Sequence, residues 1–276
     1  ALQTFSAGGN LLTGTIPSLS GLTNLTEFYV WGNQLTGTIP PLSGLTALRF
    51  FEVFNNQLSG ALPSLSGLAA LQRFYAFANQ LTGPIPSLSG LTALKAFRVH
   101  LNNLNGAIPS VSGLTALQFF NVRNNQLTGP IPSLSGLTAL QDFRVQSNLL
   151  TGAIPSLSGL PALLAFLVDN NQLTGAVPTP PATLTAGQST LCTNSLTSSG
   201  VSATDTAWNT ATGVNWQACQ IGAAAPVGTL SASPTSVIAG GTATLTASCT
   251  PAATSFTWTG GTCVGTNATT CSVTLT

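Results

Sequence analysis

The sequence predicts a solenoid of parallel strands, and three observations lead to this fold class. An Asn recurs every 23 residues from Asn10 to Asn194 without a change of phase. A Phe stands five positions before each of the first eight of these Asn residues. Leu, Gly, an aliphatic residue and Pro follow each of the eight at two, four, six and seven positions. A fixed period of this length is typical of proteins in which each repeat packs only on its neighbours.

Each repeat divides into a short strand, a polar turn and a return segment. In Phe120-Asn121-Val122, as in the other copies, alternate residues point the same way, which is typical of a strand. Phe and Val then face the core, and the residues between them face outward on a concave parallel sheet. Asn125 ends the strand, and an Asn side chain bonds readily to the backbone of a turn. We therefore expect the Asn and Phe ladders to be scaffold, with short irregular or 3-10 segments on the convex side.

The full pattern, L-x-x-F-x-V-x-x-N-x-L-x-G-x-I-P-x-L-S-G-L, resembles a leucine-rich repeat of the plant type, whose mark is a segment such as Gly129-Pro130-Ile131-Pro132. The resemblance covers residues 1–196, in eight clear repeats and a degenerate ninth. Phe replaces the usual first core Leu, and the convex segment is one residue shorter, which bears on curvature rather than on fold class. Because Ala1 lies inside a repeat, we expect further repeats to precede it.

The resemblance also implies a disulfide at the end of the solenoid. Cys192 falls in the ninth repeat and Cys219 follows after two Trp residues, and secreted leucine-rich repeat proteins commonly close their caps with cysteines. We expect residues 197–220 to form this cap with a Cys192–Cys219 bridge. Metal binding is not expected, since the only His is far away in the sequence and the spacing does not suit a metal site. A disulfide indicates an oxidising, extracytoplasmic setting.

A second unit is predicted after a linker over residues 221–229. The segment Leu230–Ala247 resembles the opening of a bacterial Ig-like domain, and Trp258 would lie in its core. Residues 230–276 are too few for a complete sandwich of about a hundred residues, so we expect a partial one. Cys263–Cys271 is the preferred bridge there and Cys249–Cys271 the alternative. Low charge and tandem modules suit a bacterial surface or secreted protein.

The composition of the chain argues against several classes of function. Only 4% of the residues are charged and the net charge is +1, which argues against electrostatic binding of nucleic acid. No apolar run approaches the eighteen or so residues of a membrane span. The sequence suggests no cofactor, no catalytic residue and no enzymatic activity, because it lacks a phosphate loop and has one His and no Cys in the concave region.

The charged residues are concentrated in one part of the repeat. Eleven of the twelve charged or His residues lie between seven positions and one position before the repeated Asn, and only Asp205 lies elsewhere. These slots belong to the concave strands, whereas the convex segments stay Ser, Thr, Gly and Ala. The same slots hold an aromatic group in repeats two to four and a basic group in repeats five to seven. We expect these candidate binding residues to be Tyr29, Trp31, Phe50, Glu52, Phe54, Arg73, Tyr75, Phe77, Arg98, His100, Phe119, Arg123 and Arg144.

Contiguous exposed aromatic residues and arginines are typical of partner sites. The arginines suit an acidic loop, a carboxylate or a sulfated glycan. Two simpler readings remain at this point: the rings cover one another, and Glu52 with Arg73 and Asp142 with Arg144 form ordinary ion pairs. The main hypothesis is an extracellular or cell-surface module that binds a protein or glycan on the concave face. The alternative is a self-assembling subunit of a surface array or fibre.

Overall fold

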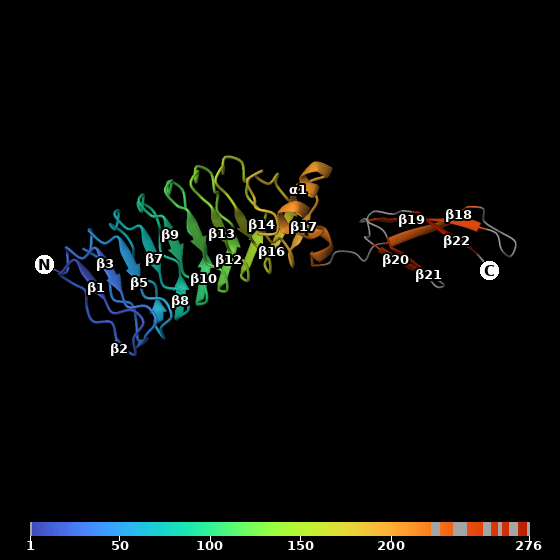
Figure 1. The fold of residues 1–276 in the computed structure, drawn as a ribbon. Coiled ribbons are helices and arrows are strands. Elements are labelled where there is room, and N and C mark those ends of the chain that lie inside the picture. The colour runs from blue at the N-terminus through green and yellow to red at the C-terminus, as the bar shows by residue number, and fades with distance from the viewer. Residues whose placement is uncertain are drawn as a thin grey trace. The chain divides into compact units, whose positions relative to one another are not determined.

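The computed structural model describes residues 2–221 in full. Beyond them it describes the backbone of 227–233, 242–250, 255–258, 261–264 and 270–274. The chain forms two compact units, Ala1–Ile221 and Gly222–Thr276, which are taken separately here. The first unit is a solenoid in which each turn of 23 residues stacks on the next (Figure 1).

The concave sheet has eight short parallel strands, as the alternation in the sequence predicts. Each strand pairs with the strand one repeat later, so that Phe28 lies opposite Phe51 and Phe120 lies opposite Phe143. The strands are β1 (Thr4–Ser6), β3 (Glu27–Tyr29), β5 (Phe50–Glu52), β7 (Arg73–Tyr75), β9 (Ala96–Arg98), β11 (Phe119–Asn121), β13 (Asp142–Arg144) and β15 (Ala165–Leu167).

A second set of parallel strands follows the repeated Asn, and the sequence analysis did not predict it. Its central Leu is buried while its Gln and Thr neighbours are exposed, as in β8. The strands are β2 (Thr13–Thr15), β4 (Gln34–Thr36), β6 (Ser59–Ala61), β8 (Gln80–Pro84), β10 (Asn103–Ala107), β12 (Gln126–Pro130), β14 (Leu149–Gly152), β16 (Gln172–Ala176) and β17 (Ser195–Thr197). The Ser-Leu-Ser-Gly-Leu segments are irregular turns, and within residues 2–196 none of them is a 3-10 helix.

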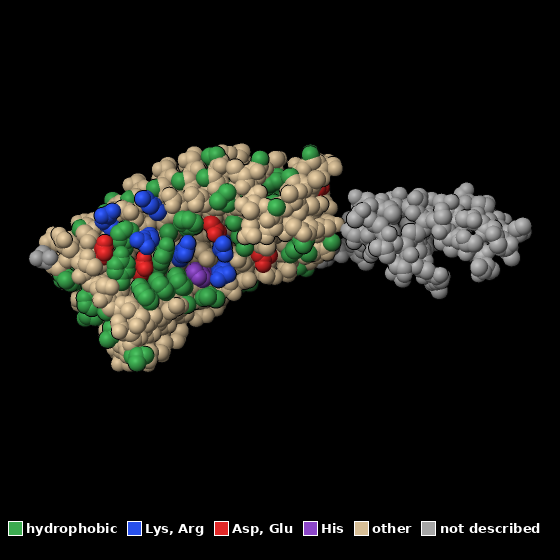
Figure 2. Space-filling model, in the orientation of Figure 1, with side chains coloured by type: hydrophobic (Ala, Val, Ile, Leu, Met, Phe, Trp, Pro, Cys, Tyr) green, Lys and Arg blue, Asp and Glu red, His purple; other side chains and the backbone are tan. Residues whose placement is uncertain are grey.

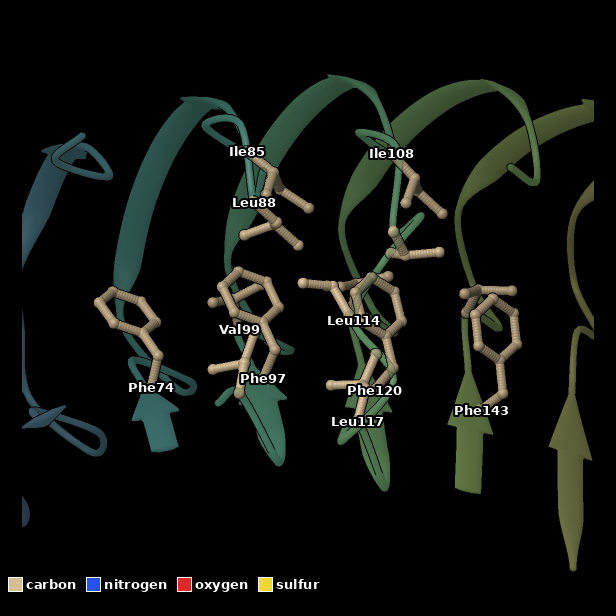
Figure 3. Packing of buried hydrophobic residues seen from close by; sticks show 14 of the residues in the cluster. Phe74, Ile85, Leu88, Phe97, Val99, Ile108, Leu114, Leu117, Phe120 and Phe143 are labelled. Carbon is tan, nitrogen blue, oxygen red and sulfur yellow. The ribbon is translucent and has the colours of Figure 1, made fainter. Parts of the chain in front are cut away.

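The core is built around the predicted column of Phe rings. Phe74, Phe97, Phe120 and Phe143 project into the solenoid from successive concave strands (Figure 3). Their ring centroids lie 5.5 to 5.8 Å apart with nearly parallel planes. Leu and Ile from the return segments pack around this column. Phe5, in the first described turn, is 41% exposed, whereas the inner Phe residues are buried.

The Asn ladder is scaffold, as predicted, and it joins each turn to the one before it. Asn102 Nδ2 donates to the carbonyls of Ala76, Val99 and His100 at 3.0 to 3.3 Å. Its Oδ1 accepts the backbone N–H of Leu81 in the preceding repeat at 2.9 Å. The same pattern recurs from Asn33 to Asn194, so the side chain of one repeat completes the turn of its predecessor.

The residue before each ladder Asn adopts a left-handed backbone. Its φ is 52° at Ala78 and 55° at Leu101, conformations that favour Gly and Asn over other residues. Gly9 and Gly32 occupy this slot in the first repeats. The tight turn after the concave strand therefore imposes local strain wherever a residue with a larger side chain stands there.

A helical cap ends the solenoid. α1 (Ser202–Thr212) and the 3-10 helix η1 (Trp216–Cys219) cover the last repeat with two buried Trp residues, and Trp208 Nε1 donates to the carbonyl of Pro178 at 2.7 Å. Cys192 and Cys219 form a disulfide. Gln220 takes the place of a further ladder Asn. Its Oε1 accepts the backbone N–H of Leu196, and its Nε2 donates to the carbonyl of Leu191.

The second unit contains short antiparallel strands. β19 (Thr242–Thr250) lies between β18 (Val227–Ser233) and β22 (Thr270–Thr274), and β20 (Ser255–Trp258) pairs with β21 (Gly261–Val264). β18 begins inside the range assigned above to the linker. The side chains of Trp258 and of Cys249, Cys263 and Cys271 lie outside the described residues. The predicted bridges and the Ig-like assignment therefore remain predictions.

Candidate functional site

The concave strands carry a band of aromatic and charged side chains on an otherwise neutral solenoid. Figure 2 shows the arginines, the carboxylates and the single His of this face gathered around a row of hydrophobic side chains. The band follows from the strand register, because equivalent slots of successive repeats lie side by side. All thirteen predicted residues lie on β3 to β13 or in the two residues that follow these strands.

Four rings stack into a continuous ladder on this face. Trp31 stacks on Phe54 at 5.5 Å between centroids, Phe54 on Phe77 at 4.4 Å, and Phe77 on His100 at 4.4 Å, with planes within 12° of parallel. A Cβ on Gly8 would lie 2.5 Å from the Trp31 indole, so this glycine leaves the space that the indole occupies. The rings thus cover one another's faces, as the alternative to a binding patch expected, while Trp31, Phe54 and Phe77 stay partly exposed and their edges border the concave surface.

Glu52 and Arg73 form one of the two predicted ion pairs. Arg73 Nη1 lies 3.2 Å from Glu52 Oε1, and its guanidinium also covers the ring of Phe50 at 4.2 Å. Glu52 is 8% exposed, which corrects the expectation that it faces solvent, and Arg73 from the next strand lies against it. Burial raises its pKa against the opposing effect of Arg73. Tyr29, opposite Glu52 on the preceding strand β3, also has a raised pKa, through its own burial and the nearby Glu27 and Glu52.

Arg98 is held between rings on both sides. Its guanidinium carbon lies 5.1 Å from the centre of the Tyr75 ring and 5.3 Å from that of Phe119. Such cation–π contacts orient a guanidinium without neutralising its charge. Among the described residues, neither Arg98 nor Arg123 has a carboxylate within 4.0 Å, whereas Arg144 Nε donates to both oxygens of Asp142 at 2.8 and 2.9 Å.

His100 is buried, which corrects its predicted exposure. It ends the ring ladder at 8% exposure, and Nδ1 has no hydrogen-bond partner among the described residues. Burial and the positive charges of Arg123, Arg98 and Arg144 lower its pKa to about 4. The imidazole is therefore neutral near pH 7. Arg123 Nε and Gln146 Oε1 are also buried without partners in the described chain.

A depression of about 210 Å³ opens at the basic end of the band. Arg98 and Arg144 belong to the same slot two repeats apart, and the shorter Asn121 stands between them. Asn121 Oδ1 accepts the backbone N–H of Arg123, which leaves the Nδ2 group as a donor. The floor and walls include Phe77, Arg98, His100, Phe119, Asn121, Asp142 and Arg144. Asn121 was not among the predicted site residues, although a small polar residue between two arginines of one slot is visible in the sequence.

Metal sites and membrane-spanning helices are absent from the described residues. These residues contain no group of His, Cys, Asp and Glu side chains placed to hold a metal ion. Within the same residues, no helix has the length and apolar character required to cross a bilayer.

Comparison with protein families gives a leucine-rich repeat model that matches residues 24–44 and 116–137. No curated protein sequence matches the chain. Among solved structures, the chain is similar to the plant peptide hormone receptor RGFR1 in complex with RGF2, at 33% identity and a TM-score of 0.64, over 67% of this chain and 31% of the receptor chain.

Two further structures share the fold. The Arabidopsis receptor kinase HAESA, in complex with the peptide hormone IDA and the co-receptor SERK1, is 29% identical over 70% of this chain and 38% of that chain, with a TM-score of 0.53. A plant ice-binding protein is 24% identical over 80% of this chain and 74% of its own, with a TM-score of 0.59, which shows the fold alone. This chain thus spans well under half of the receptor chains. The stacked turns, the Asn ladder and these similarities together identify the solenoid as a leucine-rich repeat fold with plant-type repeats.

Proposed function

We propose that this chain is a non-enzymatic, extracellular recognition module that binds a protein partner on its concave face. The observation that carries the proposal is the confinement of charge and aromatic surface to one face. Within residues 2–196 all the charged side chains lie in or beside the concave strands, while the second sheet and the convex turns display neutral polar residues. A surface that only needs to stay soluble does not require this segregation.

The structural neighbours support the same class of function. RGFR1 is described as a plant peptide hormone receptor in complex with RGF2, and HAESA as a receptor kinase in complex with the peptide hormone IDA. The Cys192–Cys219 disulfide fits an extracellular location, because such bonds persist in oxidising compartments.

The arrangement of the rings favours a protein over a glycan. Sugar rings bind aromatic side chains by stacking on an open face. Here the faces within the Trp31–His100 ladder cover one another, and Arg98 lies over Tyr75 and Phe119. Ring edges carry partial positive charge and suit carbonyl oxygens and side chains of a polypeptide.

A retention experiment tests the proposal. The purified chain and a triple variant, Tyr75→Ala, Phe77→Ala and Arg98→Ala, are immobilised and exposed to surface and secreted fractions of candidate partner cells. A matched control carries Gln80→Ala, Thr82→Ala and Gln126→Ala on the exposed side of the second sheet. We expect the wild type and the control to retain one defined protein that the triple variant loses.

Other outcomes have definite meanings. A retained glycan would correct the class of partner. Equal retention by all three forms would contradict the concave face as the binding site. Polymers of the chain that persist in the triple variant would support the alternative, a structural subunit of an array or fibre.

A further inference from the structure

The concave face is divided into two parts of different chemistry. The aromatic part consists of Trp31, Phe54 and Phe77, whose faces are covered and whose edges border the concave surface. The basic part surrounds the depression over Asn121. Both parts lie on one sheet, in adjacent slots of successive repeats, so a single extended ligand is able to contact both.

The basic part is suited to one carboxylate. Arg98 and Arg144 approach the depression from opposite sides, and Asn121 Nδ2 adds a neutral donor between them. Asp142 also lines the depression, but both of its oxygens accept from Arg144 Nε. Since Arg98 and Arg123 have no carboxylate partner among the described residues, the cluster keeps an excess of positive charge. Charge-assisted bonds from guanidinium groups are the strongest that a carboxylate forms with a protein surface.

Some buried polar atoms near the site have no hydrogen-bond partner among the described residues. In the part of the chain that the structure describes, five buried side-chain atoms lack such a partner. Three of them, His100 Nδ1, Arg123 Nε and Gln146 Oε1, belong to the slot beside Arg98, Asn121 and Arg144, and the other two, on Asp205 and Trp216, lie in the cap. Three neighbouring repeats thus carry such an atom on the concave face, and of the three residues His100 also lines the depression. Buried polar atoms are normally paired, so His100 Nδ1 at the depression is a polar group that a bound molecule or water can still satisfy.

The positions of the aromatic and basic parts define the distance between the two ligand groups that would contact them. The middle of the aromatic part is the repeat of Phe54, and Asn121 in the depression lies three repeats further on. With strands about 4.8 Å apart, the separation along the solenoid is about 14 Å, which an extended peptide covers in about four residues.

We propose that the partner presents an extended segment with a large apolar side chain and a carboxylate about four residues apart. The apolar side chain contacts the ring edges of Trp31, Phe54 and Phe77, and the carboxylate enters the depression over Asn121. This inference rests on the proposed function and deepens it by naming the chemistry of the ligand. The carboxylate comes either from an acidic side chain or from a chain terminus, and the geometry accepts both.

Selection from a random peptide library, displayed on phage and panned against the full chain, tests the proposal. We expect the selected peptides to share an aromatic or large aliphatic residue and a carboxylate at this spacing. Synthetic copies with Gln in place of the acid, or with an amidated C-terminus, then identify the source of the carboxylate. Loss of affinity on the first change assigns a side chain, and loss on the second assigns the terminus. Indifference to both overturns the proposal.

The decisive variant is Asn121→Asp, which is almost isosteric and places a carboxylate in the depression. We expect it to weaken the acidic peptide by about 10- to 100-fold, the range for a lost charge-assisted hydrogen bond, and to leave the Gln copy within about twofold of its wild-type affinity. Thr128→Asp, on the exposed side of the second sheet, controls for the added charge. Equal binding of the acidic peptide to Asn121→Asp and to the wild type would overturn the inference.

Failure of this inference is distinguishable from failure of the proposed function. If the library yields no peptide with the expected spacing while the concave triple variant still loses a retained protein, the ligand chemistry is wrong and the concave recognition site stands. If the triple variant retains that protein, the proposed function itself fails.

Discussion

The two aromatic columns of this solenoid have similar stacking geometry, but one runs through all eight repeats and the other through only four. The inner column places a Phe in each of the eight repeats, with centroids 5.4 to 5.8 Å apart, and from Phe28 onward it is buried. The concave column runs only from Trp31 to His100, with Trp31 still 38% exposed. A requirement of the fold recurs in each turn, whereas a local feature of a few turns needs another explanation. The difference therefore separates scaffold from candidate function without reference to any homologue.

Removing one ring from each column tests this difference and should give the largest change in stability. Phe97→Ala empties a fully buried position, and we expect it to lower the free energy of unfolding by about 3–5 kcal/mol. Phe77→Ala removes a half-buried ring, and we expect a loss of about 1 kcal/mol. Chemical denaturation of the two variants measures both values. Equal losses would show that the concave column is also scaffold.

The Asn ladder offers a second test, with a control inside the chain. Asn102→Ala removes four hydrogen bonds and leaves buried backbone groups without partners, so we expect a loss of about 2–4 kcal/mol. Asn10 is exposed and bonds only to the carbonyls of Ala7 and Gly8, and for Asn10→Ala we expect less than about 0.5 kcal/mol. A small effect at Asn102 would mean that the ladder does not couple the turns.

His100 makes the concave column sensitive to pH. Its pKa falls from 6.5 to about 4 on folding, so below pH 6.5 the unfolded chain binds the proton more readily than the folded chain. Stability contributed by neutral His100 is therefore present above pH 6.5 and is lost as the pH falls towards 4. It amounts to about 3 kcal/mol at most.

The variant His100→Phe isolates this effect, since it continues the ring ladder without a titrating group. We expect the difference in unfolding free energy between the two proteins to change between pH 7 and pH 4 in favour of the variant. Comparing the two proteins cancels the contribution of Glu52, whose raised pKa has the opposite slope. Parallel stability curves over this range would contradict the burial of His100.

The smallest expected change in stability comes from relieving backbone strain beside the Asn ladder. Leu101 has a φ of 55° and an exposed side chain, so Leu101→Gly relieves strain without opening a cavity. We expect a gain of about 1 kcal/mol, detected as a higher thermal midpoint. Asn124→Gly, at the same slot in the next repeat, is the control, because Asn tolerates this conformation and should gain little.

The features that repeat were predictable from the sequence, and the features that depend on neighbouring turns were not. The period alone gives the concave strands, the Phe column and the Asn ladder. The burial of Glu52 and His100 was missed because it is produced by Arg73, Phe77 and other side chains of adjacent repeats. The second sheet was missed because Gln-Leu-Thr-Gly is too short and too polar for a strand signal. Gln220 was missed because it imitates the ladder Asn from outside the repeat pattern.

The direction of the Asn ladder has a consequence for how the protein is made. Each turn is closed by a side chain that belongs to the following repeat, and the ninth by Gln220 of the cap. During synthesis the chain leaves the ribosome from its N-terminal end, and a newly emerged repeat lacks its closing side chain until about 23 more residues have been added. Ordering of the solenoid must then trail translation by one repeat, and the cap completes the last turn only when Gln220 emerges.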